Sequence, residues 1–411
     1  MIFQMRIIHV NKYYYDRAGA EIYMLDLMRL QEEDGHQVAP FSMDYPKNFP
    51  SNWSDYFVSE IQTEAGVGRG FGKLKQFKRA LWSREAYIKM SKMIDVFNPD
   101  VVHVHNIYTQ ISPSILKACQ KHKVPAVMTV HDYALLSANY SLWSKDGSMD
   151  LNKLGILATA KTKFIKDSFV ATLVLSIIQK WHKWRRLYDK HIGRYFADSR
   201  FVKDLMVKNG YDEEKISVKF PFFSGAREEF ARKDKGYILF AGRLEQYKGV
   251  QTLIKAMKEF PAVELKIAGS GNYEKELRKI AKGMKNVEFV GWISGHAKDD
   301  LQAGARVSVV PSIWNEPAGI VIFESLEKGV PVIVSDAGGM KEIVEDKISG
   351  RVFRAGDVKD LARVLREFIY DKSYADSIGE SAMQRAVEIG NPEQHLKEII
   401  DVYKGLMDKD D

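Results

Sequence analysis

The chain has 411 residues, which is enough for two or three domains with sizeable cores. Hydrophobic residues make up 45% and charged residues 28%, a balance typical of a soluble globular protein. The formal net charge of +7 is mild for a nucleic-acid-binding protein, and no zinc-finger, helix-turn-helix or RNA-binding signature accompanies it. We therefore expect no nucleic-acid partner, whereas anionic substrates or anionic lipid would suit this charge.

The cysteine content and the first residues indicate the compartment. Cys119 has no second cysteine to pair with, which fits a reducing environment, and we expect it to be a buried apolar residue. Residues 1–10 lead directly into a predicted strand, so no secretory signal is expected. No apolar stretch approaches the roughly 20 residues of a membrane-spanning helix. These features predict a cytoplasmic protein.

The first predicted elements form a strand–helix–strand opening at residues 6–10, 20–34 and 37–43. Gly19 lies at the first strand-to-helix turn, where backbone N–H groups can bind a phosphate or an acceptor. The motif is weak by itself, because one glycine at such a turn is commonplace.

Two more strands and two helices are predicted in this half, at residues 73–98, 101–105, 112–122 and 126–131. His105, Asn106, His131 and Asp132 follow the two strands, and ligands of open parallel sheets bind at the carboxyl ends of strands. We interpret His105 as a loop residue with satisfied hydrogen bonds and His131 as a site residue. No cysteine or helical histidine pair supports a zinc site.

Residues 134–166 show no regular pattern and are predicted to be a polar, basic loop. An apolar run at residues 169–178 follows, with lysines and arginines on both sides and with Trp181 and Trp184 beside the second group. The run is too short to span a bilayer, but residues 161–186 resemble an interfacial helix that could lie on anionic lipid. The alternative is a helix packed on its own domain with a solvated basic face.

Two strands, at residues 195–198 and 216–220, flank a helix at residues 199–209, and residues 221–236 are interpreted as a linker. A second strictly alternating pattern then predicts another parallel sheet with right-handed crossovers. Its strands are expected at residues 237–241, 263–268, 287–290, 307–310 and 331–335. A final helix is expected at residues 392–407.

Residues 311–324 are the stretch around which the second half is organised. They predict the end of a strand, a loop and a helix that starts near Ala318, and the first N–H groups of that helix would bind a diphosphate. Gly319 leaves room for close approach of a ligand. Glu316 precedes the helix and Glu324 lies in its second turn, so both carboxylates could accept hydrogen bonds from hydroxyls of one ligand. The alternative is an N-cap acid and a solvated helix glutamate.

Two cations are predicted to lie near this stretch. Arg243 follows the first strand of the second half, and Lys248 opens the next helix. The loop from the following strand contains Gly269 and Gly271. Each signal is weak alone, but two fixed cations and a helix start at successive strand ends are what a diphosphate requires.

Taken together, these residues resemble glycosyltransferase family 4. The landmarks are Arg243 with Lys248, the Gly-Ser-Gly at 269–271, Glu316 seven residues before Glu324, and the glycine-rich run 329–344. The stretches 103–106 and 129–132 resemble the same family. The resemblance implies an α/β protein of the GT-B fold, with two Rossmann-like domains whose parallel sheets face each other across a cleft. The implied domains are residues 1–224 for the acceptor and 225–390 for the nucleotide sugar, with a helix at 391–411 returning to the first.

The resemblance also implies roles for individual residues. Arg243 and Lys248 would bind the donor diphosphate, Glu324 the ribose hydroxyls and Glu316 a hydroxyl of the transferred sugar. Further residues would line the donor, namely Gly269, Gly271, Ala318, Gly319 and Ile320. His131 would lie beside the sugar, and Gly19 and Asp132 would line the acceptor or diphosphate side. Ala18 stands where many members have a first glycine, which leaves the path of that loop open.

The implied reaction moves a sugar from a UDP- or GDP-sugar to a glycan or lipid-linked acceptor, with retention of anomeric configuration. Glu316, His131, Arg243 and Lys248 are the expected catalytic residues. No Asp-x-Asp motif is present, so no metal cofactor is expected, and the two cations would take its place. The rival interpretations are an epimerase of the same fold, a non-catalytic binding subunit and a dinucleotide oxidoreductase. The missing Gly-x-Gly-x-x-Gly argues against the last.

Overall fold

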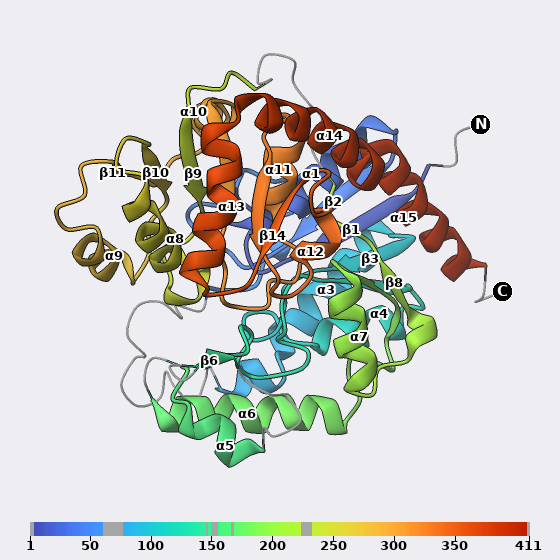
Figure 1. The fold of residues 1–411 in the computed structure, drawn as a ribbon. Coiled ribbons are helices and arrows are strands. Elements are labelled where there is room, and N and C mark those ends of the chain that lie inside the picture. Colours follow the sequence, from blue (N-terminus) through green and yellow to red (C-terminus); the bar gives the residue numbers. More distant parts are fainter. Residues whose placement is uncertain are drawn as a thin grey trace. The chain divides into compact units, whose positions relative to one another are not determined.

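A computed structural model describes residues 4–60, 77–144, 147–148, 155–165, 168–222 and 232–408. The chain divides into two compact units (Figure 1). Unit 1 consists of Met1–Asp198, Lys203–Lys219 and Glu393–Asp411, and unit 2 of Ser199–Val202 and Phe220–Pro392. The predicted domain boundary between residues 224 and 225 lies outside the described residues.

Unit 1 is built on a six-stranded sheet of order β2-β1-β3-β4-β7-β8, in which every pairing is parallel. Its strands are β1 (Arg6–Val10), β2 (Gln37–Phe41), β3 (Val101–Val104), β4 (Ala126–Val130), β7 (Ile192–Ala197) and β8 (Ile216–Val218). The residues of β3 and β4 are all buried, as expected for strands covered on both faces. The parallel sheet predicted from the alternating pattern is confirmed.

The helices of this half are α1 (Gly19–Glu33), α3 (Arg84–Phe97), α4 (Ser114–Lys121), α5 (Ile156–Lys161), α6 (Phe169–Trp184) and α7 (Arg200–Lys208). The helix predicted over residues 73–98 is interrupted, and residues 73–76 lie outside the described range. Trp82 and Ser83 are not helical, and Ser83 Oγ accepts a hydrogen bond of 3.1 Å from the Ala86 N–H as the N-cap of α3. Cys119 is buried on α4, as expected.

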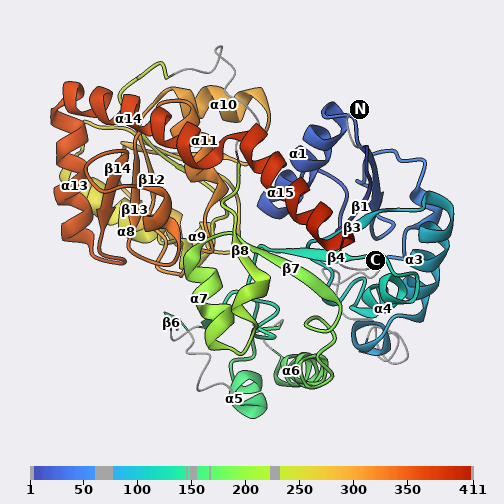
Figure 2. The ribbon, with the colours of Figure 1, turned by 90° about the vertical axis from the view of Figure 1, so that its right-hand side faces the viewer.

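The segment predicted to be a loop at 134–166 contains regular structure. Two short strands, β5 (Trp143–Ser144) and β6 (Gly147–Ser148), pair antiparallel, and α5 follows them. Figures 1 and 2 both show α5 beside α6, and the two helices pack together. The loop prediction was wrong at α5 because the repeating pattern of this helix covers fewer than two turns.

The last helix, α15 (Pro392–Met407), completes unit 1. Tyr403 is fully buried, and its hydroxyl lies 2.6 Å from Nδ1 of His103 on β3. His395 Nε2 lies 2.8 Å from the hydroxyl of Tyr23 on α1. The end of the chain is therefore part of the core of unit 1.

Unit 2 holds the second sheet, of order β11-β10-β9-β12-β13-β14 and again parallel throughout. Its strands are β9 (Tyr237–Ala241), β10 (Leu265–Ala268), β11 (Val287–Gly291), β12 (Ala305–Val310), β13 (Val332–Ser335) and β14 (Gly350–Phe353). Five of the six were predicted. The prediction missed β14, whose four residues begin with glycine and include a charged arginine.

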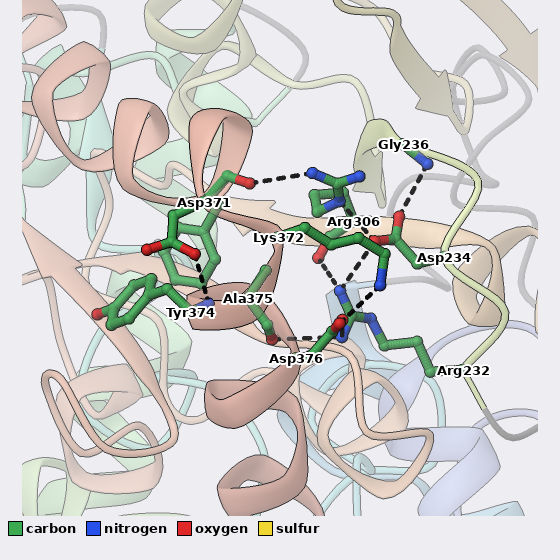
Figure 3. A network of polar contacts seen from close by, with 10 residues as sticks. Arg232, Asp234, Gly236, Arg306, Asp371, Lys372, Tyr374, Ala375 and Asp376 are labelled. Atoms are coloured by element: carbon green, nitrogen blue, oxygen red, sulfur yellow. Dashed lines mark hydrogen bonds and ion pairs between the residues drawn. The ribbon is translucent and has the colours of Figure 1, made fainter.

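The helices of unit 2 are α8 (Val250–Ala256), α9 (Glu274–Ile280), α10 (His296–Ala303), α11 (Ile320–Glu327), α12 (Met340–Ile343), α13 (Val358–Tyr370) and α14 (Lys372–Gly390). An ion-pair network fixes the entry of the chain into this unit (Figure 3). Asp234 accepts hydrogen bonds from the Gly236 N–H and from Arg306 on β12, and Arg232 pairs with Asp376 on α14 at 2.8 Å. The starts of β9 and β12 are thereby tied to one helix.

Candidate functional site

Three loops of unit 2 leave the carboxyl ends of the adjacent strands β10, β9 and β12. The loop after β9 carries Arg243 and Lys248, the loop after β10 carries Gly269–Gly271, and the loop after β12 carries Glu316. Because the carboxyl ends of parallel strands meet at one edge of a sheet, residues far apart in sequence gather there.

Glycines allow these three loops to touch. A Cβ on Gly269 would lie 1.9 Å from the Gly242 carbonyl oxygen, and a Cβ on Gly271 would lie 2.4 Å from that of Leu244. A Cβ on Gly249 would lie 1.8 Å from the carbonyl oxygen of Pro311. Gly269 and Gly271 were predicted as donor-binding residues, and the structure gives them a packing role in holding two loops together.

Lys248 and Glu316 form an ion pair at the meeting point of two of these loops. Lys248 Nζ donates to Glu316 Oε1 at 2.6 Å, and the Ser312 hydroxyl donates to the same oxygen. The Glu316 side chain is 6% exposed and that of Lys248 is 18% exposed. The ammonium of Lys248 also lies 5.1 Å from the centroid of the Trp314 ring. An ammonium has three donors, so the contact with Glu316 leaves capacity for an anion.

A second cation, Arg243, acts on Lys248. Burial lowers the pKa of Lys248, the carboxylate of Glu316 raises it, and the positive charge of Arg243 lowers it again, so that it lies below the ordinary lysine value. Two cations held close together repel each other, and an anionic group bound between them would remove that repulsion.

The start of α11 lies in the same loop. Its N-cap residue Gly319 has φ of 109°, a conformation that favours glycine, and no side chain caps the helix. Ala318 is buried, and Ile320 is the first helical residue. The helix starts two residues later than the sequence predicted, and its first N–H groups are directed at the end of the loop that carries Glu316.

Glu324, in the second turn of α11, is held by two residues of α10. Its Oε1 accepts from Lys298 Nζ at 2.6 Å and its Oε2 from Gln302 Nε2 at 2.9 Å. Burial opposes ionisation of Glu324, but Lys298, Gln302 and Lys328 more than offset this, so its pKa lies below the usual value. Glu324 is thus ionised and fixed in orientation. The sequence prediction missed Lys298 and Gln302, although their spacing of four on a helix was visible.

The glycine-rich run 329–344 holds the backbone of Glu316. The Gly339 N–H donates to the Glu316 carbonyl at 2.9 Å, and Glu316 forms an isolated parallel bridge with Gly338. A Cβ on Gly338 would lie 2.2 Å from the Glu316 carbonyl oxygen. The paired glycines let the loop after β13 pack directly on the residue that binds Lys248.

The second group of predicted residues lies in unit 1. His131 follows β4, and both of its ring nitrogens are engaged: Nε2 lies 3.0 Å from His105 Nδ1 and Nδ1 lies 3.2 Å from Asp198 Oδ2. The other oxygen of Asp198 is buried without a hydrogen-bond partner among the described residues. Tyr23 packs its ring edge-on against His131, with the ring centroids 5.2 Å apart. His131 could therefore contact a ligand through its ring carbons, or through its nitrogens once these hydrogen bonds change.

A row of buried polar groups continues behind His131. His105 Nε2 lies 3.1 Å from His9 Nδ1, and His9 Nε2 lies 2.8 Å from Gln31 Oε1. Burial lowers the pKa of His9 to about 4 and that of His105 well below its ordinary value. These histidines are neutral at physiological pH. The interpretation of His105 as a satisfied residue is confirmed, because His9 and His131 engage its two ring nitrogens. The partner His9 of His105 and the partner Asp198 of His131 were not predicted.

Three of these histidines lie close enough to be tested as a metal site. His9, His103 and His105 each offer a ring nitrogen, and these atoms lie within 4.8 Å of one another. All six of their ring nitrogens already have hydrogen-bond partners. The rings of His103 and His105 are stacked 4.5 Å apart, which does not direct their lone pairs at one point. This set favours a hydrogen-bonded network over a metal centre.

Asp132 and Gly19, the residues predicted on the acceptor or diphosphate side, also lie in unit 1. Asp132 Oδ1 accepts from the Ala134 N–H at 2.9 Å and so caps a turn, and burial raises the pKa of Asp132. Gly19 is the first residue of α1, and Glu21 two residues later is buried and accepts from the Asn11 side chain at 3.2 Å. His131, Asp132 and Gly19 thus belong to unit 1, whereas the cations and glutamates belong to unit 2.

Two family descriptions match the chain. Residues 225–385 match "Glycosyl transferases group 1" and residues 17–219 match "Glycosyltransferase Family 4". An uncharacterized glycosyltransferase of Methanocaldococcus jannaschii is 32% identical over 202 residues, which are 48% of this chain and 50% of that protein. The match thus spans about half the length of that relative. A phosphatidyl-myo-inositol mannosyltransferase of Mycolicibacterium smegmatis is 25% identical over 89% of this chain and 85% of its own.

Solved structures show the same fold. The Anabaena protein HepE in complex with UDP and glucose has a TM-score of 0.67 at 16% identity, covering 98% of this chain and 100% of its own. A sucrose-phosphate synthase of Thermosynechococcus elongatus has a TM-score of 0.71, also at 16% identity, covering 99% and 100%. With the two six-stranded parallel sheets, these similarities confirm the predicted GT-B fold.

Proposed function

Because the chain belongs to glycosyltransferase family 4, we propose that it transfers a sugar from a nucleotide diphosphate sugar to a glycan or lipid-linked acceptor. The observation that carries the proposal is the pair of cations beside the start of α11. Arg243 and Lys248 lie close enough for one to lower the pKa of the other, and Glu316 binds Lys248 directly. A diphosphate would neutralise the two cations and accept hydrogen bonds from the first turn of the helix.

Two carboxylates suit the sugar ends of such a donor. Glu324 is ionised and held by Lys298 and Gln302, so its remaining lone pairs can accept from the two ribose hydroxyls. Glu316, on the loop before the helix, would accept from a hydroxyl of the transferred sugar. The similar Anabaena structure contains UDP-glucose, so UDP rather than GDP is the first nucleotide to test.

In the proposed reaction, the bond between the anomeric carbon and the diphosphate oxygen breaks, and a bond to the acceptor oxygen forms on the same face. The proton of the acceptor hydroxyl goes to the leaving phosphate oxygen, so no separate base is needed and the configuration is retained. Arg243, Lys248 and the α11 N–H groups stabilise the charge that builds on the diphosphate. Glu316 and the neighbouring backbone orient the sugar. Since two cations occupy the diphosphate side, we propose that transfer needs no metal ion.

The relatives include a protein named for mannosyl transfer to phosphatidyl-myo-inositol and one named for lipopolysaccharide core biosynthesis. They support an acceptor that is part of a cell-surface glycan or is linked to a lipid.

The first test is calorimetric titration with UDP, GDP and ADP and with the corresponding nucleotide sugars. The nucleotide sugar that binds is then incubated with the protein, a metal chelator and candidate acceptors. We expect one nucleotide to bind, with weaker binding in Lys248→Ala, and transfer to continue in the chelator. An epimer formed without acceptor would instead assign the chain to epimerases. If no nucleotide binds to the wild type, the proposal is wrong.

A further inference from the structure

The helix α6 buries three polar side chains beside Ile178 and exposes a line of apolar side chains. Thr172, Ser176 and His182 are at most 6% exposed. Val170 and Trp184, by contrast, are 66% and 74% exposed, and Ile177 midway between them is 44% exposed. These three are spaced seven residues apart and form one line along the helix. An amphipathic helix on the surface of a globular domain normally has the opposite orientation.

Hydrogen bonds fix this orientation. The Thr172 hydroxyl accepts from the Ile165 N–H at 3.0 Å, outside the helix. Gln179 Nε2 donates to the Leu135 carbonyl at 3.1 Å, and His182 Nε2 lies 2.9 Å from the Leu81 carbonyl oxygen. Rolling the helix to bury its apolar line would break these contacts with Ile165, Leu135 and Leu81, at a cost that apolar burial would have to exceed.

Cations surround the exposed apolar line. Residues 152–188 contain eight lysines and arginines and one acid, Asp167, a net charge of +7 that equals the net charge of the whole chain. Those on and beside α5 and α6 that the structure describes as exposed are Lys161, Lys163, Lys180, Lys183, Arg185 and Arg186. The short helix α5, packed beside α6, adds Leu157, which is 65% exposed.

We propose that this outer face of α5 and α6, called here the basic–apolar face, docks on an anionic lipid bilayer. The apolar side chains would enter the boundary of the acyl chains while the cations stay among the head groups. Trp184, with the Arg185 guanidinium 5.8 Å from its ring, has the amphipathic character of an interfacial anchor. Among the described residues, no helix is long and apolar enough to cross a membrane, so the contact is peripheral.

The charge decides between lipid and a second copy of the chain. A symmetric dimer through the basic–apolar face would bring two surfaces of strong positive charge together and bury both, which is unfavourable. An anionic bilayer instead offers a negative partner for the cations and an apolar one for the line of α6.

The basic–apolar face is also connected to the β4 end of unit 1. Gln179, on the inner side of α6, and Tyr211 both donate to the carbonyl of Leu135, which lies four residues after His131. Docking would therefore place the loop after β4 near the lipid surface, where a lipid-linked acceptor would be presented. This last step rests on the proposed function, whereas docking itself does not.

The experiment is flotation of the full chain, without substrates, with vesicles of phosphatidylcholine alone or with 30% phosphatidylglycerol. The variant V170S/I177S/W184S removes the apolar line without touching the buried polar face. Its matched control is V387S/I348S/W292S, which changes the same residue types where they are 53%, 55% and 64% exposed elsewhere. Circular dichroism and the nucleotide titration show whether each variant is folded.

We expect the wild type and the control to float with anionic vesicles, less so at 0.5 M salt, and the α6 variant to bind at least about tenfold more weakly. Equal flotation of both variants would overturn the proposal, as would a wild type that floats with neither vesicle. A wild-type dimer that the α6 variant alone dissociates, without lipid binding, would assign the face to self-association. Because no substrate is present, failure of docking leaves the transfer proposal standing.

Discussion

Lys248 donates to Glu316 across 2.6 Å, so the cation expected at the diphosphate and the acid expected at the sugar are bound to each other. Each therefore fixes the position of the other. The loops that carry them are 68 residues apart in the sequence and meet through Gly249, whose missing side chain allows contact with Pro311.

Removing either cation should remove most of the activity. Lys248→Ala and Arg243→Ala are each expected to lower kcat by about 10²–10³-fold, because each would take one charge-stabilising donor from the leaving diphosphate. Lys266→Ala is the control, since this lysine also pairs with carboxylates in unit 2 and is 20% exposed against 18% for Lys248. Steady-state kinetics in which all three variants behave alike would contradict the assignment.

The affinity for a nucleoside diphosphate should fall at alkaline pH. Burial and the charge of Arg243 lower the pKa of Lys248 despite Glu316, so its proton is lost at a lower pH than that of an ordinary lysine. Loss of that proton removes a charge from the site, and calorimetry across pH 7–10 should show weaker binding as the pH rises. Lys248→Arg should move this loss to higher pH, because a guanidinium keeps its proton. A wild-type affinity that stays constant to pH 10 would show that Lys248 does not contact the diphosphate.

Glu324 should distinguish a nucleotide from a bare diphosphate. Glu324→Gln is expected to weaken UDP binding about tenfold, the effect of losing one hydrogen bond to a charged group, and to leave inorganic pyrophosphate binding unchanged. Pyrophosphate has no ribose and serves as the internal control. Equal losses for both ligands would mean that the substitution disturbs α11 rather than a ribose contact.

A side chain at Gly249 should destabilise the protein both through its positive φ and through a clash with the loop after β12. Gly249→Ala places a Cβ 1.8 Å from the Pro311 carbonyl oxygen, whereas Gly283→Ala, also at positive φ, meets no atom within 4 Å. The control should cost about 1 kcal/mol of unfolding free energy, and Gly249→Ala at least about 2 kcal/mol more. Urea unfolding measures both, and similar values would show that the loops can separate at little cost.

Unit 1 should lose stability in acid. Burial lowers the pKa of His9 to about 4 and that of His395 to about 3, and it lowers the pKa of His103 and of His105 well below the ordinary histidine value. Since an unfolded histidine binds its proton near pH 6.5, the unfolded state takes up more protons below that pH. Stability is therefore complete above about pH 6.5 and is lost as the pH falls, by about 3 kcal/mol for His9 alone.

Hydrogen exchange at pH 7 and pH 5 measures this loss in each unit separately. We expect protection to fall in β1 and β3 and to persist in β9 and β12, because unit 2 contains one histidine, His296, which is exposed. The variant His395→Gln should reduce the slope with pH. Equal loss in both sheets would point to carboxylates rather than to the buried histidines.

Much of this architecture could be predicted because its strands are short, continuous apolar runs. β1 and β9 were predicted with the bounds that the structure shows, since each is a run that is buried on both faces. β14 and α5 could not be recognised, because four and six residues carry too little pattern. The break before Ser83, the N-cap of α3, was not predicted, because the residues on both sides of it continue one basic helical pattern.

The candidate site was predictable in its residue types but less so in its contacts. The spacing of Arg243, Lys248, Glu316 and Glu324 was readable, and the pairing of Lys248 with Glu316 was not. Gly269 and Gly271 show why: a glycine needed to let two loops touch has the same letter as one needed to admit a ligand. The partners of His131 come from β3 and β7, whose order in the sheet only the three-dimensional structure supplies.

The burial of Tyr403 beside β3 has a consequence for biosynthesis. The ribosome makes the first strand of unit 1 almost four hundred residues before it makes this tyrosine, and all of unit 2 lies between them. Until the last helix leaves the exit tunnel, His103 and Gln31 have no partner there, so the earlier unit waits, incomplete, for the later one. A nascent chain stalled before residue 392 should therefore expose the half-built sheet to chaperones, even after its second half has folded.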